Sequence, residues 1–411
     1  MLSRRQFLAA LGASTLGLAG CKYWPEDGFW HRCGATELPA SLAHHALLAK
    51  VWQGIDGAQL WDCHVHLLGS GDSGSGCWVN PRMDSLLHPI ESLQKSFYLN
   101  AACVTDNDMD SAYVQRLLAL HAAFPKGAKL MLLAFDWHYN ANGERVAELS
   151  PFYTPNAYAQ RLAREHAQHF EWIASVHPYR ADAIEALERA AQGGARAVKW
   201  LPAAQGMDPA DVRCDRYYEA LARLKLPLLT HAGAELAVTG GQMQDYGNPL
   251  RLRRALDHGV CVIVAHCASL GDGIDLDRGP DGPAVNNFTL FTRLMEEPRY
   301  DKYLYGDLAA VGQLLRAGDA LRTLLTRRDW HARLVYGSDY PLPGVMPIFA
   351  PRALATEGFL KQDEAVFLSE LRRYNPLLFD IALMRLLAVD GRGFDATVFA
   401  SRRVFVDGSK A

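Results

Sequence analysis

Eight short apolar runs recur between residues 60 and 340, and most of them are separated by stretches with apolar residues at helical spacing. Runs that are apolar on both faces are typical of parallel strands covered on both sides. Strands that alternate with helices predict repeated βαβ units, and eight units predict an α/β protein with a closed (β/α)8 TIM barrel. The predicted strands begin at Leu60, Lys129, Glu171, Arg196, Leu226, Val260, Lys302 and Arg333.

Helices are predicted where apolar residues recur every three or four positions. The segment 110–124 opens with Asp110, which can cap its first turn. Residues 69–76 contain four glycines and three serines, which predicts a flexible loop over the barrel rim, and residues 140–154 are interpreted as an insertion. The other predicted helices cover residues 41–53, 90–104, 156–170, 363–374 and 377–387.

Several predicted strands end in a polar or ionisable residue, and the carboxyl ends of barrel strands meet at one rim. In the first strand, His64 and His66 are spaced by two and therefore point the same way, while Cys63 turns outward into the helix layer. Two such histidines can form half of a metal site. The stretches in question are 61–66 (WDCHVH), 195–200 (ARAVKW), 226–231 (LPLLTH), 261–266 (CVIVAH) and 334–339 (LVYGSD).

These stretches, together with residues 374–379 (YNPLLF), resemble the metal-dependent amidohydrolase superfamily, and more narrowly its branch of amidohydrolase-related decarboxylases and lactone hydrolases. The resemblance covers the chain from about Leu60 to Phe379. It implies a metal site at the carboxyl-terminal rim of the strands, and imidazole and carboxylate are ligands that a divalent ion such as Zn²⁺ accepts. The implied ligands of one Zn²⁺ are His64, His66, His231 and Asp339.

The resemblance also implies catalytic roles. Asp339 is expected to accept a proton from metal-activated water, and His266 either completes a second metal position or acts on the substrate as an electrophile or acid. Lys199 is either a free lysine beside one metal, which we favour, or a carboxylated lysine that bridges a second metal. As a lone histidine on an apolar strand, His266 could instead be a hydrogen-bonded core residue.

Further polar residues near the predicted rim are candidates for binding substrate. Glu235 follows His231 by four residues, whereas deaminase-like relatives carry a glutamate one residue closer, which disfavours a deaminase. Arg180 could hold a substrate carboxylate or be a solvated surface arginine. The remaining candidates are Asp136, His138 and His177, of which His177 precedes a proline and could simply be a loop residue.

The predicted function is that of an exported metal-dependent hydrolase in which metal-activated water attacks a carbonyl-type carbon of a small molecule such as a lactone or an amide. A non-oxidative decarboxylase is the alternative within enzymes, since it uses the same metal site but needs a cation near the departing carboxylate. A lipoprotein that binds a metal or ligand without catalysis is the alternative outside enzymes.

The first 21 residues are predicted to be an export signal. Arg4 and Arg5 lie in a twin-arginine motif, and residues 18–21 (LAGC) resemble a lipobox in which Cys21 is acylated. This predicts export by the twin-arginine route and a periplasmic protein anchored at Cys21, although an ordinary secretory leader is the alternative. The remaining chain divides into an extension (22–57), the barrel (58–390) and a carboxyl-terminal tail (391–411).

Composition limits the partners. The 411 residues are 49% hydrophobic with a net charge of −3, so nothing favours nucleic acid, and membrane contact is expected only through the lipid anchor. The eight cysteines become seven if Cys21 is lipidated, which leaves at least one free thiol. Cys33 and Cys77 are the predicted disulfide pair, whereas Cys267, like Cys63, is expected to be a buried apolar residue.

Overall fold

The computed structural model describes residues 25, 27–238 and 243–407. Within this part of the chain, eight parallel strands form the centre of the fold, and each begins within two residues of its predicted start. The prediction of the barrel strands is therefore confirmed. The strands are β1 (Trp61–His66), β3 (Lys129–Leu133), β5 (Phe170–Ile173), β6 (Val198–Trp200), β7 (Leu228–His231), β8 (Val262–Ala265), β11 (Leu304–Asp307) and β12 (Leu334–Val335).

The strands form two parallel sheets, ordered β1-β3-β5 and β12-β11-β8-β7-β6. Parallel bridges between Ala174 and Val198 and between Val65 and Tyr340 join the sheets on both sides. The joined sheets close into a (β/α)8 barrel, whose carboxyl-terminal rim is where such folds carry their active sites.

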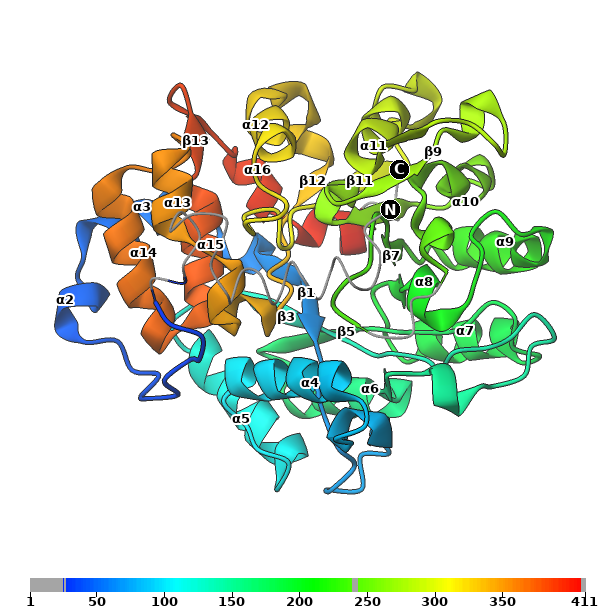
Figure 1. The fold of residues 1–411 in the computed structure, drawn as a ribbon, viewed down its shortest axis with the longest axis horizontal. Coiled ribbons are helices and arrows are strands. Elements are labelled where there is room, and N and C mark those ends of the chain that lie inside the picture. Colours follow the sequence, from blue (N-terminus) through cyan, green and yellow to red (C-terminus); the bar gives the residue numbers. More distant parts are fainter. Residues whose placement is uncertain (1–24, 26, 239–242, 408–411) are drawn as a thin grey trace.

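Helices surround the barrel (Figure 1), because their apolar faces pack against the strands. The five predicted helices after the first strand are confirmed. The predicted helix 41–53 is split, because the side chain of His45 accepts a hydrogen bond from the backbone of Leu47 and caps a second helix that begins at Ala46. The helices are α2 (Ala40–Ala43), α3 (Ala46–Trp52), α4 (Pro89–Ala102), α5 (Met109–His121), α6 (Asn156–Glu165), α7 (Ala183–Gln192), α8 (Pro202–Gln205), α9 (Asp215–Leu224), α10 (Arg253–Asp257), α11 (Asn287–Met295), α12 (Asp319–Thr326), α13 (Pro351–Thr356), α14 (Gln362–Tyr374), α15 (Pro376–Leu386) and α16 (Ala396–Phe399).

Three short antiparallel pairs lie outside the barrel: β2 (Trp78–Val79) with β4 (Phe152–Tyr153), β9 (Asp272–Ile274) with β10 (Ala284–Asn286), and β13 (Ala388–Val389) with β14 (Arg392–Gly393). The predicted insertion 140–154 thus contributes β4 to a ribbon with β2. Among the described helices, none combines the length and the apolar character that crossing a membrane requires.

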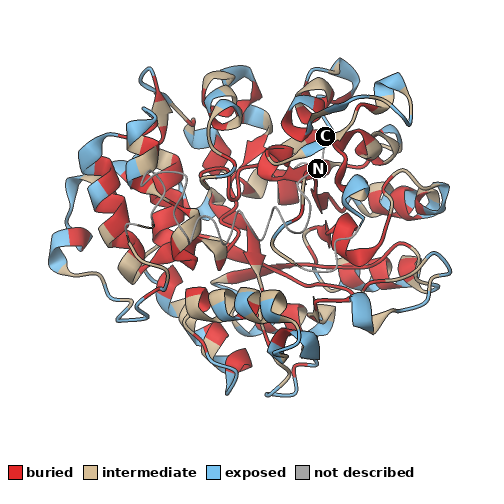
Figure 2. Cartoon of the chain, in the orientation of Figure 1, coloured by how far each residue is buried: buried red, intermediate tan, exposed pale blue. Residues whose placement is uncertain are grey.

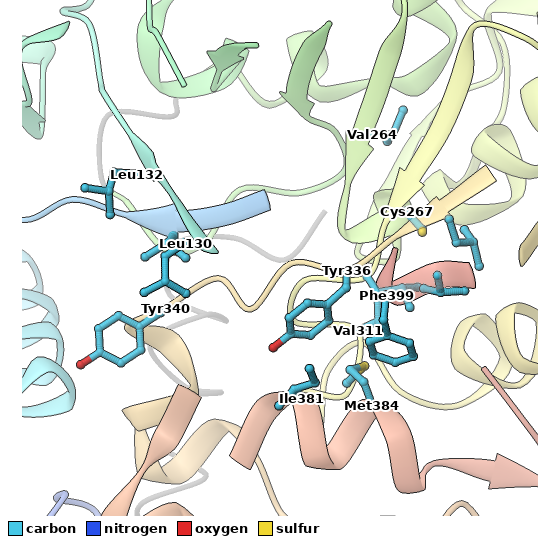
Figure 3. Packing of buried hydrophobic residues seen from close by; sticks show 14 of the residues in the cluster. Leu130, Leu132, Val264, Cys267, Val311, Tyr336, Tyr340, Ile381, Met384 and Phe399 are labelled. Atoms are coloured by element: carbon cyan, nitrogen blue, oxygen red, sulfur yellow. The ribbon is translucent and has the colours of Figure 1, made fainter. Parts of the chain in front are cut away.

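The core has an inner and an outer part. Figure 2 shows buried residues along the strands and on the inner faces of the helices, with exposed residues on the outer faces. In the outer part, Tyr336 and Phe399 lie beside Ile381 and Met384 of α15 (Figure 3). The inner part fills the barrel with side chains from the strands and with Val404 and Phe405 near the end of the chain.

Cys63 does not turn outward as predicted, because β1 contains a bulge. From Asp62 to Val65, β1 advances three residues while its partner β3 advances two. The extra residue breaks the alternation of side chains, so Cys63 packs in the inner cluster although its neighbour His64 also faces inward. Cys267 packs in the outer cluster, as predicted.

The predicted disulfide between Cys33 and Cys77 is wrong. Cys33 is bonded to Cys103, 70 residues away, with their Cα atoms 5.3 Å apart. Cys103 immediately follows α4, against which the extension packs, whereas Cys77 is buried with a free thiol beside Gly69. The bond ties residues 27–57 to the helix layer.

The glycine-rich loop 69–76 is fastened to α5 instead of lying free over the rim. The carboxylate of Asp110 accepts hydrogen bonds from the backbone of Ser70, Gly71 and Ser73, and Asp72 in turn accepts from the backbone of Asp110. Asp110 therefore holds the loop and does not cap its own helix. The cap of α5 comes from Asp72, which the local sequence pattern could not reveal.

Candidate metal centre

Three of the four predicted ligands meet at the rim. His64 and His66 come from β1, and Asp339 follows β12. His66 Nε2 lies 3.0 Å from Asp339 Oδ1, and His64 Nε2 lies 3.4 Å from the same oxygen. The ligand atoms of all three residues lie within 4.8 Å of one another, close enough to share one ion.

His231, the fourth predicted ligand, ends β7 and is buried. Its Nδ1 lies 3.4 Å from Glu235 Oε2, whereas its Nε2 is buried without a hydrogen-bond partner. A buried polar atom without a partner costs about 1–3 kcal/mol unless something else satisfies it. Three imidazoles and one carboxylate are ligands that a zinc site uses, so the residues present fit such an ion.

Asp307, at the end of β11, orients His64. Its Oδ2 lies 2.6 Å from His64 Nδ1, and the carboxylate is fully buried. Since a carboxylate accepts, Nδ1 donates and Nε2 keeps its lone pair for the rim, an arrangement typical of metal-binding histidines. Gly337 makes room for this contact, because a Cβ there would lie 2.6 Å from Asp307 Oδ1 and 2.7 Å from His64 Cβ.

His266 completes the group of histidines. Its Nδ1 donates to the carbonyl oxygen of Ala309 at 2.8 Å, which leaves a lone pair on Nε2, 3.8 Å from Asp339 Oδ2. His64, His266 and Asp307 also have ligand atoms within 4.8 Å of one another. In this tautomer Nε2 of His266 can bind an ion or accept a proton, and it can donate only after it has taken one up.

Two residues of the centre adopt left-handed backbone conformations. His266 has φ 57° and Asp339 has φ 59°, and neither is a glycine. Such conformations cost about 1–3 kcal/mol each and persist where the surrounding structure imposes them. Here they direct both side chains toward the same space at the rim.

Lys199 on β6 is buried, and its Nζ lies 3.0 Å from His64 Nε2. Nζ donates to the lone pair that His64 would offer to a metal, so Lys199 and an ion compete for that atom. With the ion bound, the lysine has to direct its donors elsewhere. Burial lowers the pKa of Lys199, while the charges of Asp339, Asp307 and Glu235 oppose that shift.

Burial prepares the histidines for metal binding. It lowers the pKa of His64, His231 and His266, which favours the neutral imidazole that binds metal. Burial alone would raise the pKa of Asp339, but its contacts with His64, His266 and His66 hold that pKa well below its usual range. Asp339 is therefore a carboxylate at neutral pH.

A cavity of about 250 Å³ opens above these residues. Its floor contains His64, His66, Lys199, His231, His266 and Asp339, and its walls are mainly apolar. Glu235 also lines the cavity, where its Oε1 accepts hydrogen bonds from the backbone of Ala237 at 2.6 Å and Val238 at 3.1 Å. Glu235 thus fixes the backbone of one cavity wall with Oε1 and contacts the ring of His231 with Oε2.

Asp136, His177 and Arg180, which we expected to bind substrate, are not among the described residues that line this cavity. Asp136 accepts from Arg180 Nη1 and from the backbone of His177, both at 2.9 Å. His138 is likewise committed, with Nδ1 donating to the Ala204 carbonyl at 2.9 Å. These residues hold the loops after β3 and β5 together.

Two important residues were missed by the sequence reasoning. Asp307 follows the pattern of an apolar strand ending in a polar residue, so the signal that identified Asp339 could have found it. Arg316 lies between β11 and α12, is buried and lines the cavity. No pattern around Arg316 distinguishes it from a surface arginine.

A second cavity, of about 360 Å³, lies at the opposite end of the barrel. Its lining includes Trp61, Lys129, Glu171 and Arg196 from the starts of strands, and Glu171 pairs with Lys129 at 2.6 Å and with Arg196 at 2.8 Å. Glu171 thus ties the starts of three strands together, and the amino-terminal end of such barrels serves stability.

A closed parallel barrel with histidine and aspartate ligands at its carboxyl-terminal rim defines a metal-dependent enzyme of the TIM-barrel type. The chain belongs to the amidohydrolase family, whose model, described as Amidohydrolase, matches residues 61–362. Enzymes of this family act on small molecules.

The solved structures that are similar to this chain are distant in sequence. An uncharacterized TIM-barrel protein from Bordetella bronchiseptica is 14% identical over 76% of this chain and 99% of that chain, with a TM-score of 0.45. A probable 2-pyrone-4,6-dicarboxylic acid hydrolase from Acinetobacter baumannii is 12% identical over 81% and 97%, with a TM-score of 0.42. The 5-carboxyvanillate decarboxylase from Sphingomonas paucimobilis is 12% identical over 84% and 98%, also with a TM-score of 0.42. No curated protein matches the sequence.

Proposed function

We propose that this protein is an exported hydrolase in which water activated at a site for one Zn²⁺ would attack a carbonyl-type carbon of a small molecule such as a lactone or an amide. The observation that carries the proposal is the cluster of His64, His66 and Asp339 on the cavity floor, beside the unpartnered Nε2 of His231. A metal bound by these four residues supplies Lewis acidity and a water of lowered pKa.

The surrounding residues then move the proton and hold the substrate. Asp339 is a carboxylate whose Oδ2 lies 3.8 Å from His266 Nε2. It accepts a proton from the attacking water and passes that proton to His266 Nε2. The protonated His266 can return the proton to the leaving group. If His64 Nε2 held a metal, Lys199 Nζ would be free to donate to the carbonyl oxygen of the substrate and would stabilise the negative charge that develops there.

The reaction is tested with small lactones, amides and aromatic carboxylic acids, with ring opening, incorporation of ¹⁸O from water and release of carbon dioxide followed separately. We expect incorporation of ¹⁸O without carbon dioxide, and Asp339→Asn should lower kcat by at least about 10³-fold because a proton acceptor and a metal ligand are lost together. Carbon dioxide without ¹⁸O incorporation would replace the hydrolase by a decarboxylase. If the zinc-loaded protein turns over none of these compounds, the result would favour a lipoprotein that binds a metal or ligand without catalysis.

A decarboxylase is retained as the second candidate because of one residue. Arg316 places a guanidinium on the cavity wall, and a decarboxylase requires a cation near the departing carboxylate. In a decarboxylase the carboxylate bound at Arg316 would leave as carbon dioxide. In a hydrolase the same carboxylate would only anchor the substrate.

Export is proposed from the leader, which lies outside the described residues. Changing Arg4 and Arg5 together to lysine should leave the precursor in the cytoplasm, because the twin-arginine pair is the export signal. Cys21→Ser should release the exported protein from the membrane, because the acylated side chain is lost. Cell fractionation measures both results, and unchanged localisation in both variants would refute the proposal.

A further inference from the structure

We infer that the cavity selects an organic acid that carries one anionic group, held by Arg316, on an apolar aliphatic or aromatic body. This inference rests on the proposed function, since it describes the substrate of the same site. Its two parts are the charge of Arg316 and the character of the walls.

The guanidinium of Arg316 lacks a carboxylate partner. The side chain is 7% exposed, its Nη1 lies 3.5 Å from Ser269 Oγ, and its Nε is buried without a hydrogen-bond partner. No ion pair to Arg316 occurs among the described residues. A buried arginine in this position costs free energy, and a bound anion would recover it through two parallel hydrogen bonds.

The nearest carboxylates are already committed. Asp339, Glu235 and Asp307 act on Arg316 through their charges and partly oppose the lowering of its pKa by burial. Their oxygens, however, contact other groups: Asp339 contacts His66, Glu235 accepts from the backbone of Ala237 and Asp307 contacts His64. The donors of Arg316 therefore stay available to a ligand.

The rest of the cavity offers little to a second charge. The only other basic side chains among its described lining residues are the floor histidines and Lys199, which belong to the metal centre. A second carboxylate against the walls would lose its hydration and could gain at most neutral donors such as the amide of Gln313, at a net cost in free energy. The walls include Phe97, Phe152, Leu201, Leu270, Leu342 and Ile348.

The size of the cavity sets the scale of the ligand. About 250 Å³ is slightly below the usual range of ligand pockets, roughly 300–1,000 Å³, so the ligand is small. An acid of about six to eight carbon atoms has enough apolar surface to contact the walls while its carboxylate reaches Arg316. Each buried methylene group contributes about 0.8 kcal/mol.

The test is equilibrium binding by calorimetry, which does not require turnover. Hexanoate, hexanamide and the dicarboxylate adipate are titrated into the zinc-loaded protein and, because a carboxylate can also bind zinc, into the metal-stripped protein. We expect hexanoate to bind at least about tenfold more tightly than hexanamide in both forms, and at least about tenfold more tightly than adipate in the metal-stripped protein, where no zinc ion can bind a second carboxylate. Equal or tighter binding of adipate to the metal-stripped protein would overturn the inference.

Substitutions of Arg316 test whether its side chain binds the carboxylate of hexanoate. Arg316→Met should weaken hexanoate at least about tenfold and leave hexanamide unchanged, while Arg316→Lys should keep part of the preference. Arg322→Met, at an exposed position of α12, is the matched control and should bind like the parent. Unchanged hexanoate binding in Arg316→Met would refute the role of Arg316, and the metal content of each variant reports whether it has folded.

The two proposals fail in different ways. If hexanoate binds through Arg316 but no substrate is turned over, the inference stands and the proposed reaction is wrong. If substrates are hydrolysed but dicarboxylates are preferred, the reaction stands and the inference is wrong.

Discussion

Two buried histidines show how the surroundings distinguish a candidate ligand from a structural residue. His231 leaves Nε2 buried and unpartnered beside the metal centre. In His177, Nε2 donates to the Gln205 carbonyl at 3.0 Å, and Nδ1 accepts from the backbone of Tyr179 at 3.1 Å. Both follow an apolar run in the sequence, and only the partners of their nitrogens distinguish them.

From the burial of His177 we predict that the folded protein loses stability in acid. Burial lowers its pKa to about 3, so the unfolded chain takes up this proton near pH 6.5 and the folded chain only near pH 3. Between these values the unfolded state binds more protons, and the free energy of unfolding falls by up to about 1.4 kcal/mol per pH unit as the pH falls. Above pH 6.5 the contribution is fully present.

Urea unfolding at several pH values between 6.5 and 4.5 measures this slope. His177→Gln should reduce the slope by about 1.4 kcal/mol per pH unit, because glutamine takes up no proton. His44→Gln, at an exposed position, should leave the slope unchanged. A slope in His177→Gln equal to that of the parent would show that His177 is not held neutral.

At this scale, residues that end strands were predictable and residues fixed by contacts between loops were not. His64, His66, His231 and Asp339 lie where strand ends place them, as predicted. Asp136, His177 and Arg180 also follow strands, but their contacts with one another turn them away from the cavity. Arg316 is a candidate only because it is buried and lines the cavity, and a single sequence does not show either property.

At the scale of elements, Arg372 of α14 organises one wall of the cavity. It is fully buried and its guanidinium donates to four backbone carbonyl oxygens in the rim loop, which we define as residues 342–349. Leu342, Val345 and Ile348 of this loop line the cavity. One rigid side chain thus fixes the backbone of a wall that has no regular strand or long helix.

Arg372→Lys should lower the free energy of unfolding by about 3 kcal/mol, because a single ammonium group cannot reach all four carbonyls and leaves some buried without a donor. Urea unfolding measures the change. The neighbouring Arg373→Lys is the matched control, since Arg373 is partly exposed and pairs with Glu370 at 2.9 Å, so its loss should cost less than about 1 kcal/mol. Equal losses in the two variants would contradict the role of Arg372.

Elements with strong periodicity were predicted well, and elements fixed by distant partners were not. The eight strands and the helices α4, α5, α6, α14 and α15 follow from hydrophobic spacing. The bulge in β1, the attachment of residues 69–76 to Asp110 and the bond between Cys33 and Cys103 depend on contacts across the fold. Local pattern carries no information on such contacts.

At the scale of the whole molecule, the two ends of the barrel are used differently. At the amino-terminal end, Val404 and Phe405 pack into the barrel, and the backbone of Trp61 donates to Ser401 Oγ at 3.1 Å. At the carboxyl-terminal end the cavity stays open above the metal centre. Of the two cavities, only the one at the carboxyl-terminal end is lined by the candidate metal ligands.

The central claim is that His64, His66, His231 and Asp339 hold a single catalytic zinc ion. Elemental analysis of the purified protein and its variants tests it most directly. The parent should contain about one equivalent of zinc, and His64→Ala, His231→Ala and Asp339→Asn should each lose most of it, because three ligands hold the ion far less tightly than four. Lys199→Ala should keep its zinc and lose rate. Full zinc in any two of the three ligand variants would contradict the site, and two equivalents in the parent with zinc loss in Lys199→Ala would replace it by a two-metal site bridged by carboxylated Lys199.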